Sequence, residues 1–249
     1  MLAFLLLAVL LPTPDVHPVA AAPTTGRELI AAMHERYAGK WYRTLSFVQT
    51  TTLANGDTAT WYEAASLPGR LRIDFGPDTA RTTLLFAGDS IYQFRDRTLT
   101  RGQPFVHPLM VLGFDVYAQP VERTVAQLTS LGFDLGALHA DTWRGRPVYV
   151  VGASPGDTLG RQFWVDQERL VFVRMIERSR RDSTVHIVTE FNDYRPLGAG
   201  WIAAEVRATV NGKVVQLEQY HDIKADPPLP TDLWDGGKLP EATWMRARE

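Results

Sequence analysis

Strict alternation of apolar and polar side chains in residues 67–94 is the feature that most constrains the fold. In its first part three apolar side chains alternate with three charged ones: Leu71, Ile73 and Phe75 with Arg70, Arg72 and Asp74. Apolar runs follow at 82–86 and 91–94, and the turn-forming sequences Gly76-Pro77-Asp78 and Gly88-Asp89 separate the three segments. This pattern predicts three short antiparallel strands, with one apolar and one solvent-exposed face. The functional question is whether protein or ligand covers the apolar face.

The same two-residue period recurs along most of the chain. Before the alternating segment it occupies 41–53 and 58–67, with a hairpin turn at Asn55-Gly56-Asp57. Further strands are expected at 98–102, 145–151, 161–165, 170–178, 184–194, 201–210 and 214–223. No strand–helix–strand alternation is present. We therefore expect a mainly β (α+β) protein, in which a single curved antiparallel sheet of about ten or eleven strands forms an open half-barrel.

Two amphipathic helices are expected to cover the concave face of this sheet. Thr25 and Glu28 have capping-box spacing, apolar side chains follow at helical spacing, and Gly39 ends the first helix. The second helix spans 121–131 and lies within residues 104–141, which also hold a short apolar helix or loop at 107–113. This section resembles a lid-like helical insertion between two halves of the sheet.

The first residues are typical of a secretory signal peptide. Residues 1–11 form an apolar run too short to span a bilayer, and a proline pair and small residues follow it. We expect a signal peptide at 1–22, cleaved after Ala21, with a buried strand or an uncleaved anchor as the alternative. The domain would then occupy 23–234, with a proline-rich closing strap at 225–234 and a flexible tail at 235–249. A periplasmic or secreted location follows.

Composition excludes several classes of function. The 26 basic and 28 acidic residues give a net charge of −2, which argues against nucleic-acid binding because phosphate contacts need a basic face. The chain has no cysteine, and therefore no disulfide, thiol nucleophile or amino-terminal lipid-anchored cysteine.

No catalytic or metal-binding motif is convincing. Residues 152–156 match the pattern GxSxG, but Pro155 follows Ser154 and a turn is expected where a nucleophile elbow needs a helix. The histidines form no HExxH or HxH pair, and only His186 and His221 could be neighbours in the sheet. We expect no catalytic residue, no metal and no cofactor.

Aromatic side chains on the predicted strands leave two interpretations open. They are Phe47, Trp61, Phe75, Phe86, Tyr92, Phe94, Trp164, Phe172 and Trp201. Core packing accounts for most of them. A concave sheet lined with them would also suit an acyl chain, because apolar cavities hold such ligands by burial.

Five segments carry a resemblance to a known family. An amphipathic amino-terminal helix is followed by LSFVQTTTL at 45–53, LPGRLRIDF at 67–75 and TLLFAGDSIYQF at 83–94, with QFWVD at 162–166 and IVTEFNDY at 187–194 later. In this order they resemble the LolA-type periplasmic lipoprotein carriers and their relatives LolB and RseB, over residues 26–234. The resemblance implies an open half-barrel whose mouth is plugged by helices, with acyl chains entering between sheet and helices.

We expect the ligand contacts to come from both layers. The expected contacts on the sheet are Phe47, Trp61, Leu71, Ile73, Phe75 and Phe86, and those on the helices are Leu29, Met33, Val125 and Leu128. The family resemblance further implies an arginine, just before a proline, that latches the lid. Here Leu67 precedes Pro68, so the latch is missing or replaced by Arg70 or Arg72. This departure limits the prediction to lipid binding.

The expected partners are lipid or lipoprotein acyl chains, with a transient membrane-protein donor or acceptor, bound by a monomer. The alternative is an envelope-stress sensor or regulator that binds the periplasmic segment of a membrane protein, as RseB-type relatives do.

Overall fold

One antiparallel sheet contains every strand of the computed structural model, which describes residues 21–76, 82–179, 182 and 184–236. The sheet has thirteen strands in the order β6-β5-β4-β3-β2-β1-β13-β12-β11-β10-β9-β8-β7, and its two edge strands do not pair with each other. The strands are β1 (Thr44–Leu53), β2 (Thr58–Ser66), β3 (Arg70–Gly76), β4 (Thr83–Ala87), β5 (Ser90–Arg95), β6 (Thr98–Pro104), β7 (Leu138–Trp143), β8 (Arg146–Val151), β9 (Gln162–Asp166), β10 (Phe172–Arg178), β11 (His186–Leu197), β12 (Gly200–Val210) and β13 (Lys213–Ala225). The predicted mainly β class and open, curved sheet are confirmed.

The thirteen strands exceed the expected ten or eleven, and β7 is the one for which no range was expected. This edge strand reads LHADTW, and most of its side chains are exposed or half-buried. Because it covers no core, its sequence has no apolar alternation to mark it. The predicted helical section at 104–141 is correspondingly shorter, since β7 begins at Leu138.

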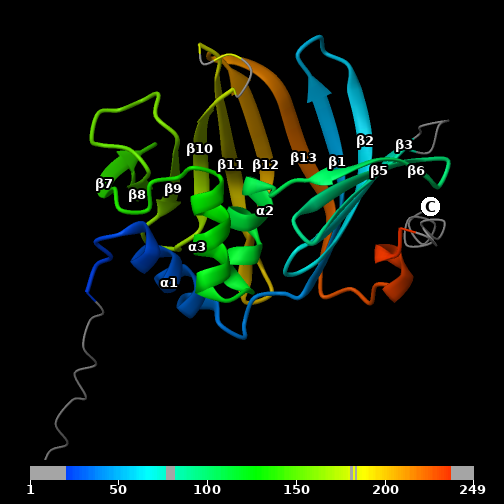
Figure 1. The fold of residues 1–249 in the computed structure, drawn as a ribbon, viewed down its shortest axis with the longest axis horizontal. Coiled ribbons are helices and arrows are strands. Elements are labelled where there is room, and N and C mark those ends of the chain that lie inside the picture. Colours follow the sequence, from blue (N-terminus) through cyan, green and yellow to red (C-terminus); the bar gives the residue numbers. More distant parts are fainter. Residues whose placement is uncertain (1–20, 77–81, 180–181, 183, 237–249) are drawn as a thin grey trace, which may run out of the picture.

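Pairing between β1 and β13 joins two meanders into one sheet. Strands β1 to β6 follow one another in the first meander, and β7 to β13 in the second. The join runs nearly the full length of β1, from Leu45 opposite Ala225 to Leu53 opposite Gln216. Strands from the two ends of the chain therefore lie side by side in the middle of the sheet (Figure 1).

Three α-helices and one 3-10 turn lie together on one side of the sheet (Figure 1). They are α1 (Gly26–Tyr37), α2 (Pro108–Gly113), the 3-10 turn η1 (Asp115–Tyr117) and α3 (Val121–Ser130). The last three connect β6 to β7, the two opposite edges of the sheet. A chain segment tied to both edges must cross the hollow between them, so the helical section covers the concave face.

The predicted caps of α1 are present. The side chain of Thr25 accepts a hydrogen bond from the backbone N–H of Glu28 at 3.2 Å, and the Glu28 carboxylate bonds Thr24 instead of closing the box on Thr25. After the helix, Gly39 adopts a φ of 69°, a conformation that favours glycine. The whole apolar face of α1 is buried, since it consists of Leu29, Ile30, Met33 and Tyr37.

The outer face of β3 to β5 is covered, contrary to the prediction of a solvent-exposed face. Arg72 and Asp74 are buried there and form an ion pair at 2.8 Å, and Thr83 also donates to Asp74 at 2.6 Å. The cover is the closing strap with its 3-10 turn η2 (Thr231–Trp234), whose Leu233 is fully buried and whose Trp234 packs on Leu85 and Phe94. Charged residues were expected in water here because the strap that shields them is remote in sequence.

Two expectations fall largely or wholly outside the described residues. Only the last two positions of the expected signal peptide and the first two of the expected tail are included. Within the described ranges no helix is long and apolar enough to cross a membrane.

Replacement of Asp74 by alanine tests the buried ion pair. It would leave the Arg72 guanidinium, 4% exposed, without its carboxylate, and removal of one partner of a buried pair costs about 3–5 kcal/mol. We expect a loss of that size in the free energy of unfolding, measured by urea denaturation. Glu122→Ala is the matched control, because the ion pair that Glu122 forms with Arg27 is exposed and is worth about 1 kcal/mol or less. Equal losses in the two variants would contradict this account.

Candidate functional site

The register of the central strands determines which side chains face the helices. On β1 the inward positions are Leu45, Phe47, Gln49 and Thr51, because alternate residues share a face. Phe47 pairs with Glu63 of β2, and Glu63 with Ile73 of β3. These pairings carry one inward-facing row from strand to strand across the middle of the sheet.

A cavity of about 320 Å³ lies between this inward face and α2. Its volume falls at the lower end of the range of about 300–1,000 Å³ that is usual for small-molecule sites. Most of its wall is apolar: Leu45, Phe47, Trp61, Ala65, Leu67, Leu71, Ile73, Leu84, Phe86, Leu109, Met110, Phe114, Phe191, Val206 and Ala208.

Short helix α2 forms the roof of the cavity. Pro108 occupies the first turn, where its missing N–H costs nothing. At the other end Gly113 has no Cβ, and a Cβ there would lie 2.8 Å from the ring of Phe191. Glycine therefore lets α2 pack directly on β11, and Leu109, Met110 and Phe114 line the cavity.

The structure separates the ten expected contact residues into two groups. Phe47, Trp61, Leu71, Ile73 and Phe86 line the cavity, and Phe75 packs edge-on against Trp61 with ring centroids 4.8 Å apart. The four helix residues lie elsewhere. Leu29, Met33 and Leu128 are fully buried in the main core and Val125 packs against it, so α1 and α3 support the fold while α2 lines the cavity.

One side of the cavity wall carries polar groups that sequence reasoning missed. Two carboxyl groups line it, Glu63 of β2 and Glu218 of β13. Glu218 accepts hydrogen bonds at both oxygens, from the Tyr220 hydroxyl at 2.9 Å and from the Gln216 side-chain amide at 2.6 Å. The available signal was their alternation with other inward positions, Trp61 and Ala65 on β2 and Gln216 and Tyr220 on β13.

Burial raises the pKa of both carboxyl groups. For Glu63 the pKa is well above its ordinary value, first because the group is desolvated and second because Glu218 is close. For Glu218 burial again raises the pKa, while the two hydrogen bonds from Tyr220 and Gln216 oppose the change.

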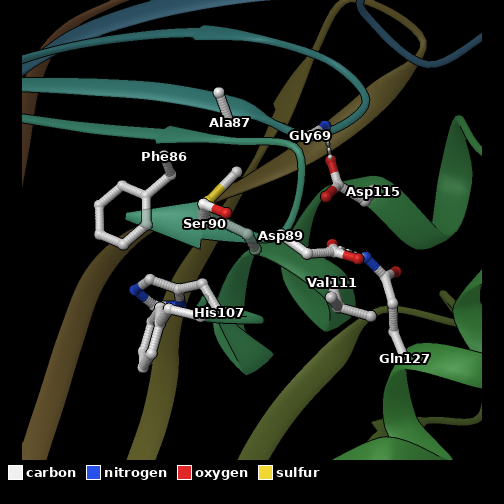
Figure 2. Close-up of a pocket in the computed structure, with 11 residues that line it drawn as sticks. Gly69, Phe86, Ala87, Asp89, Ser90, His107, Val111, Asp115 and Gln127 are labelled. Carbon is white, nitrogen blue, oxygen red and sulfur yellow. Dashed lines mark hydrogen bonds between the residues drawn. The ribbon is translucent and has the colours of Figure 1, made fainter. Parts of the chain in front are cut away.

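Polar contacts tie the helical section to the turns of the sheet (Figure 2). The backbone N–H of Gly69 donates to Asp115 at 2.9 Å, and the Gln127 side chain donates to Asp89 at 2.7 Å. Arg123 also pairs with Asp89. The contacts border a hollow of about 20 Å³, room for about one water molecule, which shares Phe86 and Met110 with the large cavity.

The family resemblance assigned the connection between lid and sheet to an arginine. Leu67 lines the cavity, as its apolar character requires. Arg72 points to the outer face and pairs with Asp74, and Arg70 is exposed, so neither replaces the latch. Asp115 and Asp89 instead connect lid and sheet.

The GxSxG match lies in the loop between β8 and β9, where a strand and not a helix follows, as predicted. His186 and His221 are not brought together, since His186 pairs with Arg178 on β10 and His221 with Val48 on β1. Among the described residues no group of three potential metal ligands occurs.

The pH dependence of stability tests the Asp115 contact. Burial raises the pKa of Asp115 from 3.8 to about 6, so between these values the folded protein keeps a proton that the unfolded chain has released. The free energy of unfolding of the wild type therefore falls as pH rises through this range. Asp115→Asn keeps the acceptor oxygen but does not titrate, so its free energy of unfolding lacks this decrease. We expect the variant to gain about 3 kcal/mol over the wild type between pH 3.5 and pH 7 in urea unfolding.

Asp134→Asn is the control for this experiment, because the exposed Asp134 also accepts from a glycine N–H at 2.9 Å. A difference between wild type and Asp115→Asn that stays constant with pH would refute the assignment.

No protein-family model matches the sequence, and no curated protein matches it. Three solved structures share the fold. A DUF1329 family protein from Desulfovibrio piger has a TM-score of 0.57 at 12% identity, over 86% of this chain and 98% of that one. A Vibrio parahaemolyticus domain described as outer membrane lipoprotein-sorting has a TM-score of 0.58 at 13% identity, over 86% and 97%. A LolA superfamily protein from Nitrosomonas europaea has a TM-score of 0.51 at 11% identity, over 85% and 98%.

Identities this low relate the folds alone. The curved open sheet, the helices on its concave face and these three likenesses agree with the sequence resemblance: the chain has the LolA-like fold.

Proposed function

We propose that this protein is a carrier-like binding protein of the periplasm or of the secreted fraction, which holds the apolar chain of a lipid or lipoprotein between sheet and α2. The observation that carries the proposal is the cavity of about 320 Å³ with its mostly apolar wall. An apolar chain that enters the cavity is removed from water, and no covalent or hydrogen bond is needed to hold it. Each buried methylene contributes about 0.8 kcal/mol to the free energy of binding. Phe47, Trp61, Leu71, Ile73 and Phe86 would contact it.

Release follows from the way in which the roof is held. Helix α2 has six residues and is bounded by η1, whose Asp115 accepts from Gly69. Few polar contacts need to break for α2 to move away from the sheet, and the same apolar surfaces reseal afterwards. Such a mechanism needs no catalysis and no cofactor, and we propose none.

Displacement of a bound fluorophore tests the proposal. The neutral apolar fluorophore N-phenylnaphthylamine should bind the protein with increased fluorescence, and an added alkyl alcohol should displace it. Ala208→Trp places an indole in the cavity from β12 and should weaken fluorophore binding about tenfold or more, which is about 1.4 kcal/mol or more.

Arg207→Trp is the matched control. Arg207 is the neighbour of Ala208 on the same strand, its side chain points to the opposite face and is 40% exposed, so the same indole lies outside the cavity. Binding should be unchanged in this variant. If neither the fluorophore nor any alkyl chain binds the wild type, the proposal is wrong. Capture of a membrane protein's segment without any lipid would favour the regulator alternative.

A further inference from the structure

A carboxyl group without a partner faces the cavity. Glu63 is 4% exposed and lines the wall, and within the described residues its side chain makes no hydrogen bond or ion pair. Desolvation penalises the ionised form of this carboxyl and raises its pKa well above the ordinary value. A leucine or methionine at this inward position would fit the surrounding apolar wall better, so Glu63 is not explained by packing.

The second carboxyl group adds to this cost. Glu218 lines the same cavity and accepts donors at both oxygens, from the Gln216 amide and the Tyr220 hydroxyl. Glu63 lies near enough for Glu218 to raise its pKa. Burial acts in the same direction, and both effects favour the protonated form of Glu63 when no cation lies beside it.

The cavity wall supplies no cation of its own. Among its lining residues in the described chain there is no lysine or arginine, and the other titratable side chains there are Tyr220 and His107. Burial keeps His107 neutral by lowering its pKa to about 4. Tyr220 donates its proton to Glu218. The positive charge that this pair of carboxyls would accept must therefore come with the ligand.

We infer that the ligand is an amphiphile whose apolar chain carries a primary ammonium group, and that this group binds the carboxyl group of Glu63 at the cavity wall. This inference rests on the proposed function and names the head group of the cargo. An ammonium has three N–H donors, and the carboxyl oxygens of Glu63 at this wall are the acceptors that can carry a negative charge and accept no hydrogen bond from the described residues. Binding would draw the proton from Glu63, because a cation beside it favours the ionised form.

The same geometry disfavours other head groups. A fatty-acid carboxylate would meet two carboxyl groups and no cation, so it would bind with its head in solvent or in protonated form. An alcohol can donate one hydrogen bond but brings no charge. Burial of the apolar chain contributes equally to the binding of the amine, the carboxylate and the alcohol. The preference for the amine therefore comes from Glu63 and Glu218.

Competition between three dodecyl ligands tests the inference. Dodecylamine, dodecanol and dodecanoate would each displace N-phenylnaphthylamine from the full chain at pH 8, below their micelle concentrations. We expect dodecylamine to bind at least tenfold more tightly than dodecanol, and dodecanoate more weakly than both. Calorimetry in two buffers of different ionisation enthalpy should show that dodecylamine binding releases a proton from the protein and that dodecanol binding does not.

Glu63→Gln keeps the size of the side chain and removes its charge. The variant should lose the tenfold preference for dodecylamine over dodecanol and the release of a proton. Glu35→Gln, on the exposed side of α1, is the control and should behave as wild type. A cooperative urea-unfolding transition shows that each variant is folded.

The outcomes distinguish the two proposals. If all three ligands displace the fluorophore equally and Glu63→Gln changes nothing, the ammonium inference is wrong and the apolar-chain proposal stands. If dodecanoate binds most tightly at pH 8, the inference is also wrong. If no dodecyl ligand displaces the fluorophore, the proposed function itself fails.

Discussion

Pairing between β1 and β13 is the interaction on which the rest of the structure depends. It joins two meanders, each built from neighbouring strands, into one sheet whose edges are β6 and β7. The chain must then pass from one edge to the other, and the helical section does so across the concave face. Sheet curvature, lid and cavity are thus consequences of one long strand pairing.

The cavity combines two surfaces with opposite requirements. Its apolar wall gains free energy when any chain replaces water, whereas its two carboxyl groups lose hydration when buried. Hydrogen bonds from Tyr220 and Gln216 offset part of that loss at Glu218, and nothing in the described residues offsets it at Glu63. Polar groups left in this state in a cleft are more often part of a binding site than of a core.

Sequence reasoning predicted the part of the fold that depends on local periodicity. Strands with alternating side chains and the capped α1 were found where expected. Five of the six residues named on the sheet line one cavity, since residues that share a face on paired strands stay together; their contact with a ligand stays a prediction. The short apolar helix or loop expected at 107–113 is α2, but six residues are too few to show a helical period, and none of them was among the expected contacts. Ligand contacts were expected at Leu29 and Leu128 because these residues lie on the apolar faces of the longer helices. Both side chains are completely buried in the core.

Charged residues inside the protein were missed for a related reason. Acidic and basic side chains on strands are normally expected to face water, yet Arg72 and Asp74 lie under the closing strap and Glu63 lies in the cavity. Which face of a strand is covered depends on segments far away in sequence. The sequence pattern shows which residues of a strand share a face. Only the tertiary structure shows what covers each face.

Native mass spectrometry of the wild-type protein, purified from its host cells, tests the central claim most directly. The account predicts a population with one amphiphile of lipid mass bound per chain, released when the protein is unfolded. A single mass equal to that of the bare polypeptide, obtained under conditions that preserve known protein–lipid complexes, would contradict it.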